Sequence, residues 1–537
     1  RSVDGGRQFF TRAYDFGFTP SVEEALRLWP KDVLVEDAVR VIRRFKPQVV
    51  ESIFPDPATT KYDSHGQHKA AGATAFAAFP LAGDAKALPR LAAEGLAPWK
   101  PQALYRSAYF DGKSATVTAP IGVIDPLSGR TVFQLAMASR SMHRSQDMGQ
   151  LQETGPRDAR LGWIQGGAGV EGKDVFAGID TRLRAIVAGV EPAARRQKAA
   201  EQLDAAADLC IKARAALAPE RLGDAASSLA QALGHLRAAA AIVAEGGAAD
   251  RPAGELIAET IEVAEVGLAA AAGVAIDATS DREALIEGET FPVRATLYAS
   301  GASPIADASV TLVPAAEWLG AQPLAGDAKA VAAGTLGVWE LKPAVPKGAP
   351  ATVPYFLRKP LEGTLYDWSD TRPEERGEPF GPPVLSARFR FKVGDTEVEL
   401  DREVVHRHRD QILGEVRRPL RVVPLVEVAL SENQLAWPID QRAPRRLDVV
   451  LTSHSKSALE GKLELAVDGK APIHVAPQPF TLPATDAADG QPVRVALTLD
   501  PARGLAPGRY PLHLAAVLAD GERFDLAVPL IDSPHIR

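Results

Sequence analysis

Residues 19–54 read TPSVEEALRLWPKDVLVEDAVRVIRRFKPQVVESIF, and this stretch predicts the order helix, helix, strand. Thr19 is placed to cap the first helix, with Pro20 at its first position and two glutamates in its first turn. The second helix stops at Pro47 and carries apolar residues at helical spacing, namely Leu34, Ala38, Val41, Ile42 and Phe45. The short run QVVESIF then leads into a loop at residues 55–64. This alternation is typical of an open α/β sheet, where ligands bind at strand ends.

The remainder of the chain changes character twice. Residues 104–139 predict strands in the runs LYRSAYF, ATVTAPIGVI and TVFQLAMAS, whereas residues 191–273 are rich in alanine and predict three helices. After residue 273 the segments become short, alternating and bounded by turns, which is typical of β-sandwiches. We therefore expect a multidomain α and β protein. Its expected domains are residues 1–190, a helical linker or small bundle at 191–273, one β-sandwich at 274–420 and a second at 421–537.

Composition excludes several classes of protein. Lys and Arg total 61 against 68 Asp and Glu, which gives a net charge of −7 and leaves no dense basic block for nucleic acid. The single cysteine, Cys210, excludes a disulfide framework and a cysteine-based zinc site within the chain. Because charges interrupt every alanine-rich stretch, a transmembrane helix is not expected.

The loop after the first predicted strand contains YDSHGQHKAAG at residues 62–72, with His65 and His68 three positions apart. Residues at this spacing share one face of a helix, so the two imidazoles would lie close together. Neutral imidazole suits zinc, but two histidines do not complete a four-coordinate site. From these residues alone, half of a metal site and a solvated polar turn both remain open.

Several quoted stretches occur in the order and approximate spacing found in one enzyme family. They are FFTRAYDFGF at 9–18, RVIRRFKPQVVESIFPDP at 40–57, DSHGQHKAAG at 63–72 and RSMHRSQDMG at 140–149. With them the chain resembles the PIG-L/LmbE-like deacetylases, zinc-dependent enzymes that remove N-acetyl groups from N-acetylglucosamine-type sugars. PYFLRKPLEGTLYDW, GEVRRPLRVVPLVEV and LIDSPHI are similar to the long bacterial members that carry β-sandwiches.

The resemblance implies a truncated Rossmann-like α/β deacetylase domain in residues 1–190, with Zn²⁺ as cofactor and an N-acetylated sugar or glycoconjugate as substrate. The family's His-Pro-Asp-Asp motif, which supplies two zinc ligands and the general base, does not occur in the 537 residues. By resemblance it would lie upstream of Arg1, and the chain alone is expected to be a poor or inactive catalyst. The exported long members imply a periplasmic or secreted location.

The same resemblance assigns roles to the histidines. His68 corresponds to the third zinc ligand, and His65 to the histidine that stabilises the oxyanion or protonates the leaving amine. Asp63 or Ser64 could cap the helix that presents His68, and Asp63 could instead orient a histidine by a hydrogen bond.

Four further residues are candidates by resemblance. Asp15 matches an Asp-x-Gly that hydrogen-bonds a sugar hydroxyl, with a turn aspartate as the alternative, and Arg12 is either a neighbouring substrate contact or a surface arginine. His143 and Gln146 match a His-x-Ser-Gln stretch near the pocket, although a helix-capping polar cluster explains them nearly as well. His406 and His408 alternate on a predicted strand and are expected to form a solvated face.

Two other functions stay open. One is a non-catalytic glycan-binding or scaffold protein with a degenerate α/β domain, and the other is a metal-dependent amidohydrolase with a non-sugar N-acyl substrate. Pocket shape would decide the second alternative, since zinc-bound water can attack any accessible amide.

Overall fold

The computed structural model describes residues 5–108, 112–126, 128–143, 149–166, 174–301, 304–430, 435, 443–467, 473–485, 490–501 and 510–526. Within these residues the chain mixes α-helices with several β-sheets and divides into two compact units. The first unit combines the residues up to Ala185 with Pro354–Gly381, and the second takes Ile186–Val353 and the residues from Pro382 onward.

The first unit is an α/β unit. Its elements are α1 (Val22–Leu28), α2 (Lys31–Phe45), β1 (Val49–Ser52), α3 (Gly66–Ala82), α4 (Pro89–Ala93), β2 (Ala103–Ser107), β3 (Val117–Pro120), β4 (Ile124–Asp125), β5 (Arg130–Thr131), α5 (Val132–Arg140) and β6 (Asp158–Gly166). The sheet order is β1-β2-β6-β3, with β1 parallel to β2 and the other neighbours antiparallel. The predicted order helix, helix, strand is confirmed.

Two local predictions in this unit are wrong. The run TVFQLAMAS forms α5 instead of a strand, because Thr131 and Gln134 make a reciprocal capping box at 3.1 and 3.0 Å. Ser21 caps α1 in place of Thr19, since its side chain accepts the Glu24 N–H. Strand β6 is not among the predicted strands.

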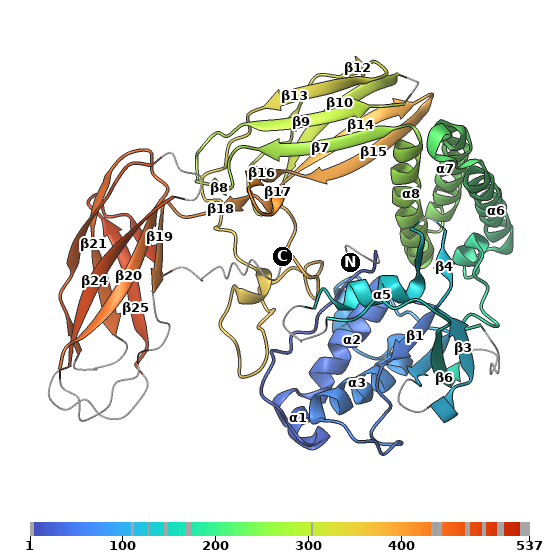
Figure 1. Ribbon diagram of the computed structural model, residues 1–537, viewed down its shortest axis with the longest axis horizontal. Coiled ribbons are helices and arrows are strands. Elements are labelled where there is room, and N and C mark those ends of the chain that lie inside the picture. The colour runs from blue at the N-terminus through green and yellow to red at the C-terminus, as the bar shows by residue number, and fades with distance from the viewer. Residues whose placement is uncertain are drawn as a thin grey trace. The chain divides into compact units, whose positions relative to one another are not determined.

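Helices α2 and α3 lie side by side (Figure 1) and share an apolar core. Val35, Val39 and Ile42 of α2 contact Ala78 and Ala82 of α3. The predicted apolar stripe of α2 is therefore only partly right, because Phe45 is 47% exposed. The buried face instead includes charged residues, namely Glu36, Asp37, Arg40 and Arg43.

Arg43 of α2 caps the C-terminal end of α3 with its side chain. Its side chain is almost fully buried and donates to the carbonyl oxygens of Leu81, Ala82, Asp84 and Ala87. The last carbonyls of a helix have no partner within it, so a cation there supplies both hydrogen bonds and a favourable charge.

Pro354–Gly381, here called the return segment, packs with the α/β unit although it follows the strands of the second unit. It forms backbone hydrogen bonds with the N-terminal stretch: Tyr14 N to Thr364 O at 2.7 Å, Tyr366 N to Arg12 O at 2.7 Å and Phe10 N to Gly377 O at 2.8 Å. The return segment lies inside the range expected to form the first sandwich, but it belongs to the unit that holds His65 and His68.

Helices and one sandwich-like pair of sheets begin the second unit. The helices are α6 (Ala193–Ala216), α7 (Gly223–Ala244) and α8 (Arg251–Ala271), as predicted. The strands are β7 (Val274–Ser280), β8 (Ala284–Leu285), β9 (Val293–Ala299), β10 (Ile305–Pro314), β11 (Leu324–Ala325), β12 (Lys329–Val331), β13 (Thr335–Leu341), β14 (Leu385–Val393), β15 (Thr396–Glu403), β16 (Val405–Asp410), β17 (Gly414–Pro419) and β18 (Arg421–Val422). One sheet has the order β11-β10-β14-β15 and the other β13-β9-β7-β16-β17. Trp339 and Phe389 meet edge-to-face between them.

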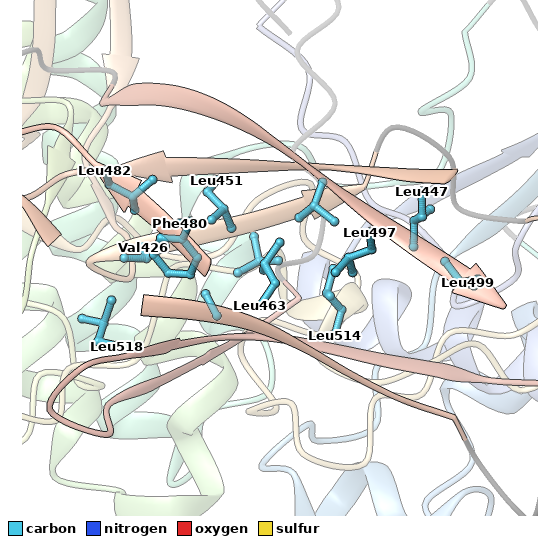
Figure 2. Close-up of a cluster of buried hydrophobic side chains, with 13 residues drawn as sticks. Val426, Leu447, Leu451, Leu463, Phe480, Leu482, Leu497, Leu499, Leu514 and Leu518 are labelled. Atoms are coloured by element: carbon cyan, nitrogen blue, oxygen red, sulfur yellow. The ribbon is translucent and has the colours of Figure 1, made fainter. Parts of the chain in front are cut away.

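A second sandwich-like pair of sheets follows. Its strands are β19 (Val426–Leu430), β20 (Arg445–Ser453), β21 (Leu459–Val467), β22 (Ile473–Val475), β23 (Gln478–Leu482), β24 (Gln491–Pro501), β25 (Leu512–Leu518) and β26 (Arg523–Asp525). They form the sheets β19-β20-β24-β22 and β23-β21-β25-β26. Figure 2 shows leucines of the two sheets pointing toward one another, with Leu451 and Leu497 from one and Leu463 and Leu514 from the other. This burial of alternate residues confirms the β-rich prediction.

Candidate functional site

The histidine pair lies where the loop after β1 enters α3. His65 is the N-cap residue of α3 in an extended conformation, and His68 lies in the first turn. Their ring centroids are 3.8 Å apart, so the helical spacing does bring the two imidazoles together. Both side chains are partly buried.

Aromatic rings hold the pair in place. Phe54, just after β1, stacks on His68 with ring centroids 4.0 Å apart and an angle of 18° between the planes. Because His65 also lies within 4 Å of the His68 centroid, it must occupy the opposite face of that ring. Phe18 contacts His65 at 5.8 Å. The four rings therefore form a continuous row of contacts, stacked between Phe54 and His68 and tilted elsewhere, that restricts the orientation of both imidazoles.

Gln67 fixes the tautomer of His65. The Gln67 amide nitrogen donates to Gly17 O at 2.9 Å, which leaves Oε1 facing His65 Nδ1 at 2.9 Å. An amide oxygen can only accept, so His65 Nδ1 must carry its proton. In neutral His65 the lone pair is therefore on Nε2. Thr19 strengthens this arrangement by donating to the same Oε1 at 3.0 Å.

The Ser64 hydroxyl lies 3.0 Å from His68 Nδ1 and holds that nitrogen by a hydrogen bond, in which a hydroxyl can either donate or accept. Burial, and then the charge of neighbouring His65, lower the pKa of His68 below its ordinary value. This favours the neutral imidazole. With Nδ1 engaged, Nε2 is the atom that remains for a ligand.

Two glycines let α3 approach its neighbours closely. A Cβ atom on Gly66 would lie 2.1 Å from Ser21 O and 2.4 Å from Thr19 Oγ1. A Cβ atom on Gly72 would lie 2.2 Å from Pro55 O. Any larger side chain at either position would push the helix away from the segments that carry Thr19 and Phe54, and hence disturb the histidine pair.

The structure corrects the capping role expected for Asp63 and shows what Arg12 contacts. Asp63 is exposed and does not cap α3, while Ser64 and Gln67 occupy the Nδ1 atoms that it was expected to orient. Arg12 binds Asp37 at 2.7 Å and Glu36 at 2.9 Å, and stacks on Trp368. These contacts hold Arg12 beside two buried carboxylates, which Arg40 also binds.

The other candidates are placed as follows. Asp15 is exposed, and one of its carboxylate oxygens accepts the Phe16 N–H at 2.9 Å. Two residues later, the carbonyl oxygen of Gly17 accepts a hydrogen bond from Gln67. His143 is exposed just beyond α5, and among the described residues the partners found for His65 and His68 do not include it. Gln146 lies outside the described residues. His406 and His408 share a face of β16 as predicted, but they are partly buried and stacked at 5.3 Å instead of solvated.

Sequence reasoning missed Phe54 and Gln67 as members of the site. The position of Gln67 inside HGQH was the available signal, since a side chain between two histidines on a helix start can reach either one. No local pattern marks Phe54, because its stacking depends on how α3 packs against the end of β1.

Imidazole nitrogen is a donor type that zinc accepts, and a hydrogen bond to Nδ1 sets the orientation of a ligating ring. Among the described residues there is no group of three or more His, Cys, Asp or Glu side chains placed to hold a metal ion. The described residues of this region thus offer a metal site the imidazole of His68, with His65 beside it.

No family model and no curated protein matches this chain. Red sea bream transglutaminase is 11% identical, with a TM-score of 0.21, and the match covers 50% of this chain and 34% of that one. Escherichia coli alpha-2-macroglobulin activated by porcine elastase is 8% identical over 47% of this chain and 22% of its own, with a TM-score of 0.18. Pseudomonas fluorescens alkylpurine DNA glycosylase AlkC, bound to DNA containing an abasic site analogue, is 12% identical over 41% and 63% of the two chains, with a TM-score of 0.14. The chain thus spans about a third of the transglutaminase.

A separate finding concerns membranes. Within the described ranges, none of the helices combines the length and apolar character that crossing a bilayer requires.

Proposed function

We propose that the α/β unit is part of a Rossmann-like, zinc-dependent hydrolase that removes N-acetyl groups from N-acetylglucosamine-type sugars. One observation carries the proposal: His65 and His68 lie with their rings 3.8 Å apart at the start of α3, each with Nδ1 held by a neighbouring polar side chain. A solvated polar turn does not require this arrangement. A site that must present two Nε2 atoms in fixed directions does.

The two histidines take different roles in this proposal. His68, whose pKa is lowered by burial and by His65, is neutral and suited to bind the metal. Bound zinc would supply a hydroxide nucleophile, because it lowers the pKa of its water to about 7.

His65 donates its Nδ1–H to the Gln67 side-chain oxygen and presents Nε2 to the substrate. When Nε2 is also protonated, it can donate to the oxygen that becomes negative during attack, or pass its proton to the leaving amine. Asp15, exposed in the segment that also holds Gly17, is the proposed acceptor for a sugar hydroxyl. A periplasmic or secreted location belongs to the same proposal.

The test is acetate release from N-acetylglucosamine and its β-linked dimer by the protein made from its natural gene in the presence of zinc. We expect release by the natural protein, a loss of about a hundredfold or more in His65→Ala, and no change in His474→Ala, which alters an exposed histidine of β22. Absence of acetate release from both sugars, or equal rates in His65→Ala and the natural protein, would overturn the proposal. Release from N-acyl amino acids alone would favour the amidohydrolase with a non-sugar substrate.

The non-catalytic glycan-binding or scaffold function is the second candidate. The observation that favours it is Arg12, expected as either a substrate contact or a surface arginine, which is held by Asp37 and Glu36. The same assay separates the two, since a binding protein would retain the sugar without releasing acetate.

A further inference from the structure

The α/β unit contains a hollow whose lining does not include the histidine pair. It is a cavity of about 420 Å³, within the range of small-molecule pockets. Its lining combines apolar side chains with charged and polar ones. The apolar residues include Pro55, Ala73, Phe76 and Ala77, and the charged ones are Lys31, Asp56 and Arg106.

The sequence of α3 explains why space remains here. The helix reads GQHKAAGATAFAAFPLA, and two of the side chains on this face, Ala73 and Ala77, are methyl groups one turn apart. Phe76 beside them supplies a flat apolar surface. Small residues on either side of an aromatic ring leave room for a ligand of about the size of a six-membered ring, which could pack against Phe76.

The charged side chains of the lining determine the charge of the ligand that fits. Lys31 begins α2 and Arg106 lies near the end of β2, so two cations face the hollow from different elements. Asp56 is the one acidic side chain of the lining, and its carboxylate accepts Ala58 N–H at 3.0 Å within its own turn. The formal charge of the lining is therefore +1, and its cations suit a carboxylate or phosphate.

We propose that this hollow, here called the Phe76 pocket, binds a small organic anion that joins an apolar ring to a carboxylate or phosphate group. Pro55 lines the Phe76 pocket, while Phe54 before it stacks on His68. Phe76 lies eight residues beyond His68, or about 12 Å along the helix axis. The Phe76 pocket is thus a neighbour of the histidine pair but separate from it, and its occupancy does not depend on the proposed deacetylation.

The test is calorimetric titration of the full chain, without added zinc, using phenyl phosphate and benzoate as probes. Benzyl alcohol serves as the neutral control and inorganic phosphate as the control for the charged group alone. We expect at least one aromatic anion to bind about tenfold more tightly than either control. The stronger of the two identifies the acidic group as phosphate or carboxylate.

Variants that remove either a positive or a negative charge from the lining make the test specific to the Phe76 pocket. Lys31→Gln and Arg106→Gln should each weaken binding of the anion by about fivefold, whereas Asp56→Asn should tighten it. Ala77→Leu should block binding because the larger side chain fills part of the hollow. Lys86→Gln, at an exposed lysine outside the lining, should leave the affinity unchanged. Failure of both anions to bind, equal binding of benzyl alcohol, or affinity that is unchanged in Lys31→Gln, Arg106→Gln and Ala77→Leu would overturn the proposal.

Discussion

The guanidinium of Arg376 donates a hydrogen bond of 2.6 Å to the carboxylate of Glu94, although 282 positions separate the two residues in the chain. Glu94 also accepts from Arg40 of α2 at 3.0 and 3.1 Å. Trp368 of the return segment lies within 6 Å of the guanidinium groups of Arg12 and Arg40. A network of buried and partly buried charges therefore joins the return segment to the rest of the α/β unit.

Replacement of Glu94 by glutamine should loosen this fastening. It leaves Arg40 and Arg376 without their shared anion, and breaking a buried ion pair in this way costs about 3 kcal/mol. Hydrogen exchange is the measurement: amides of α2 and of the return segment should exchange about a hundredfold faster, with β20 and β24 unchanged as an internal reference. Glu23→Gln, at an exposed glutamate of α1, should leave all of these rates as they are.

Acid should release the return segment. Burial raises the pKa of Glu94, but Arg40 and Arg376 outweigh it and lower the pKa below the ordinary 4.5. Burial likewise raises the pKa of Glu375, while Arg358 and Arg372 lower it to a net value below 4.5. A carboxylate whose pKa is lower in the folded than in the unfolded protein stabilises the fold at every pH above its unfolded-state pKa. This stabilisation is lost as the pH falls through the folded-state pKa.

Protection of the return segment from exchange should therefore be constant from pH 7 to about 5 and fall below about pH 4.5. The measured rates are corrected for the intrinsic effect of pH on exchange. Glu94→Gln should show a weaker dependence on pH, because one of the two titrating carboxylates is gone. Protection that rises on acidification would contradict this account.

A methyl group at Gly66 should disturb the histidine pair. In Gly66→Ala the new Cβ would meet Ser21 O at 2.1 Å, so the start of α3 must shift. Gly17→Ala is the matched control, because nothing lies within 4 Å of its Cβ position. Nitrogen-15 spectra of labelled histidines should show changed His65 and His68 signals in the first variant only. Equal changes in both variants would mean that close packing at Gly66 does not position the rings.

Gln67 should matter for catalysis more than Asp63 does. Gln67→Leu removes the acceptor for His65 Nδ1 and the bond to Gly17 O, so His65 should lose both its tautomer and its orientation. Loss of such a supporting hydrogen bond lowers activity about 10- to 100-fold. The rate of acetate release should fall in Gln67→Leu and stay unchanged in Asp63→Asn.

The order of helices and strands around the site could be predicted because it follows from local patterns. Apolar periodicity, Pro47 and the alternating runs after residue 273 place most elements correctly. The run at 131–139 is the instructive failure, since its apolar residues suit a strand and only the pairing of Thr131 with Gln134 indicates a helix.

Other features depend on contacts between distant residues and leave no local signal. Arg12 looks like a surface cation in sequence and becomes structural only because Glu36, Asp37 and Trp368 surround it. The return segment reads as part of a sandwich because its neighbours in sequence are strands. The closeness of His65 and His68 could be predicted from their spacing of three at the start of a helix, whereas the stacking of Phe54 could not.

The measurement that tests the central claim most directly is zinc binding by the protein made from its natural gene, with X-ray absorption at the zinc edge. The account predicts about one zinc per chain with histidine nitrogen at about 2.0 to 2.1 Å, lost in His68→Ala and retained in His474→Ala. Zinc binding of unchanged affinity in His68→Ala, or a zinc environment without histidine, would contradict it.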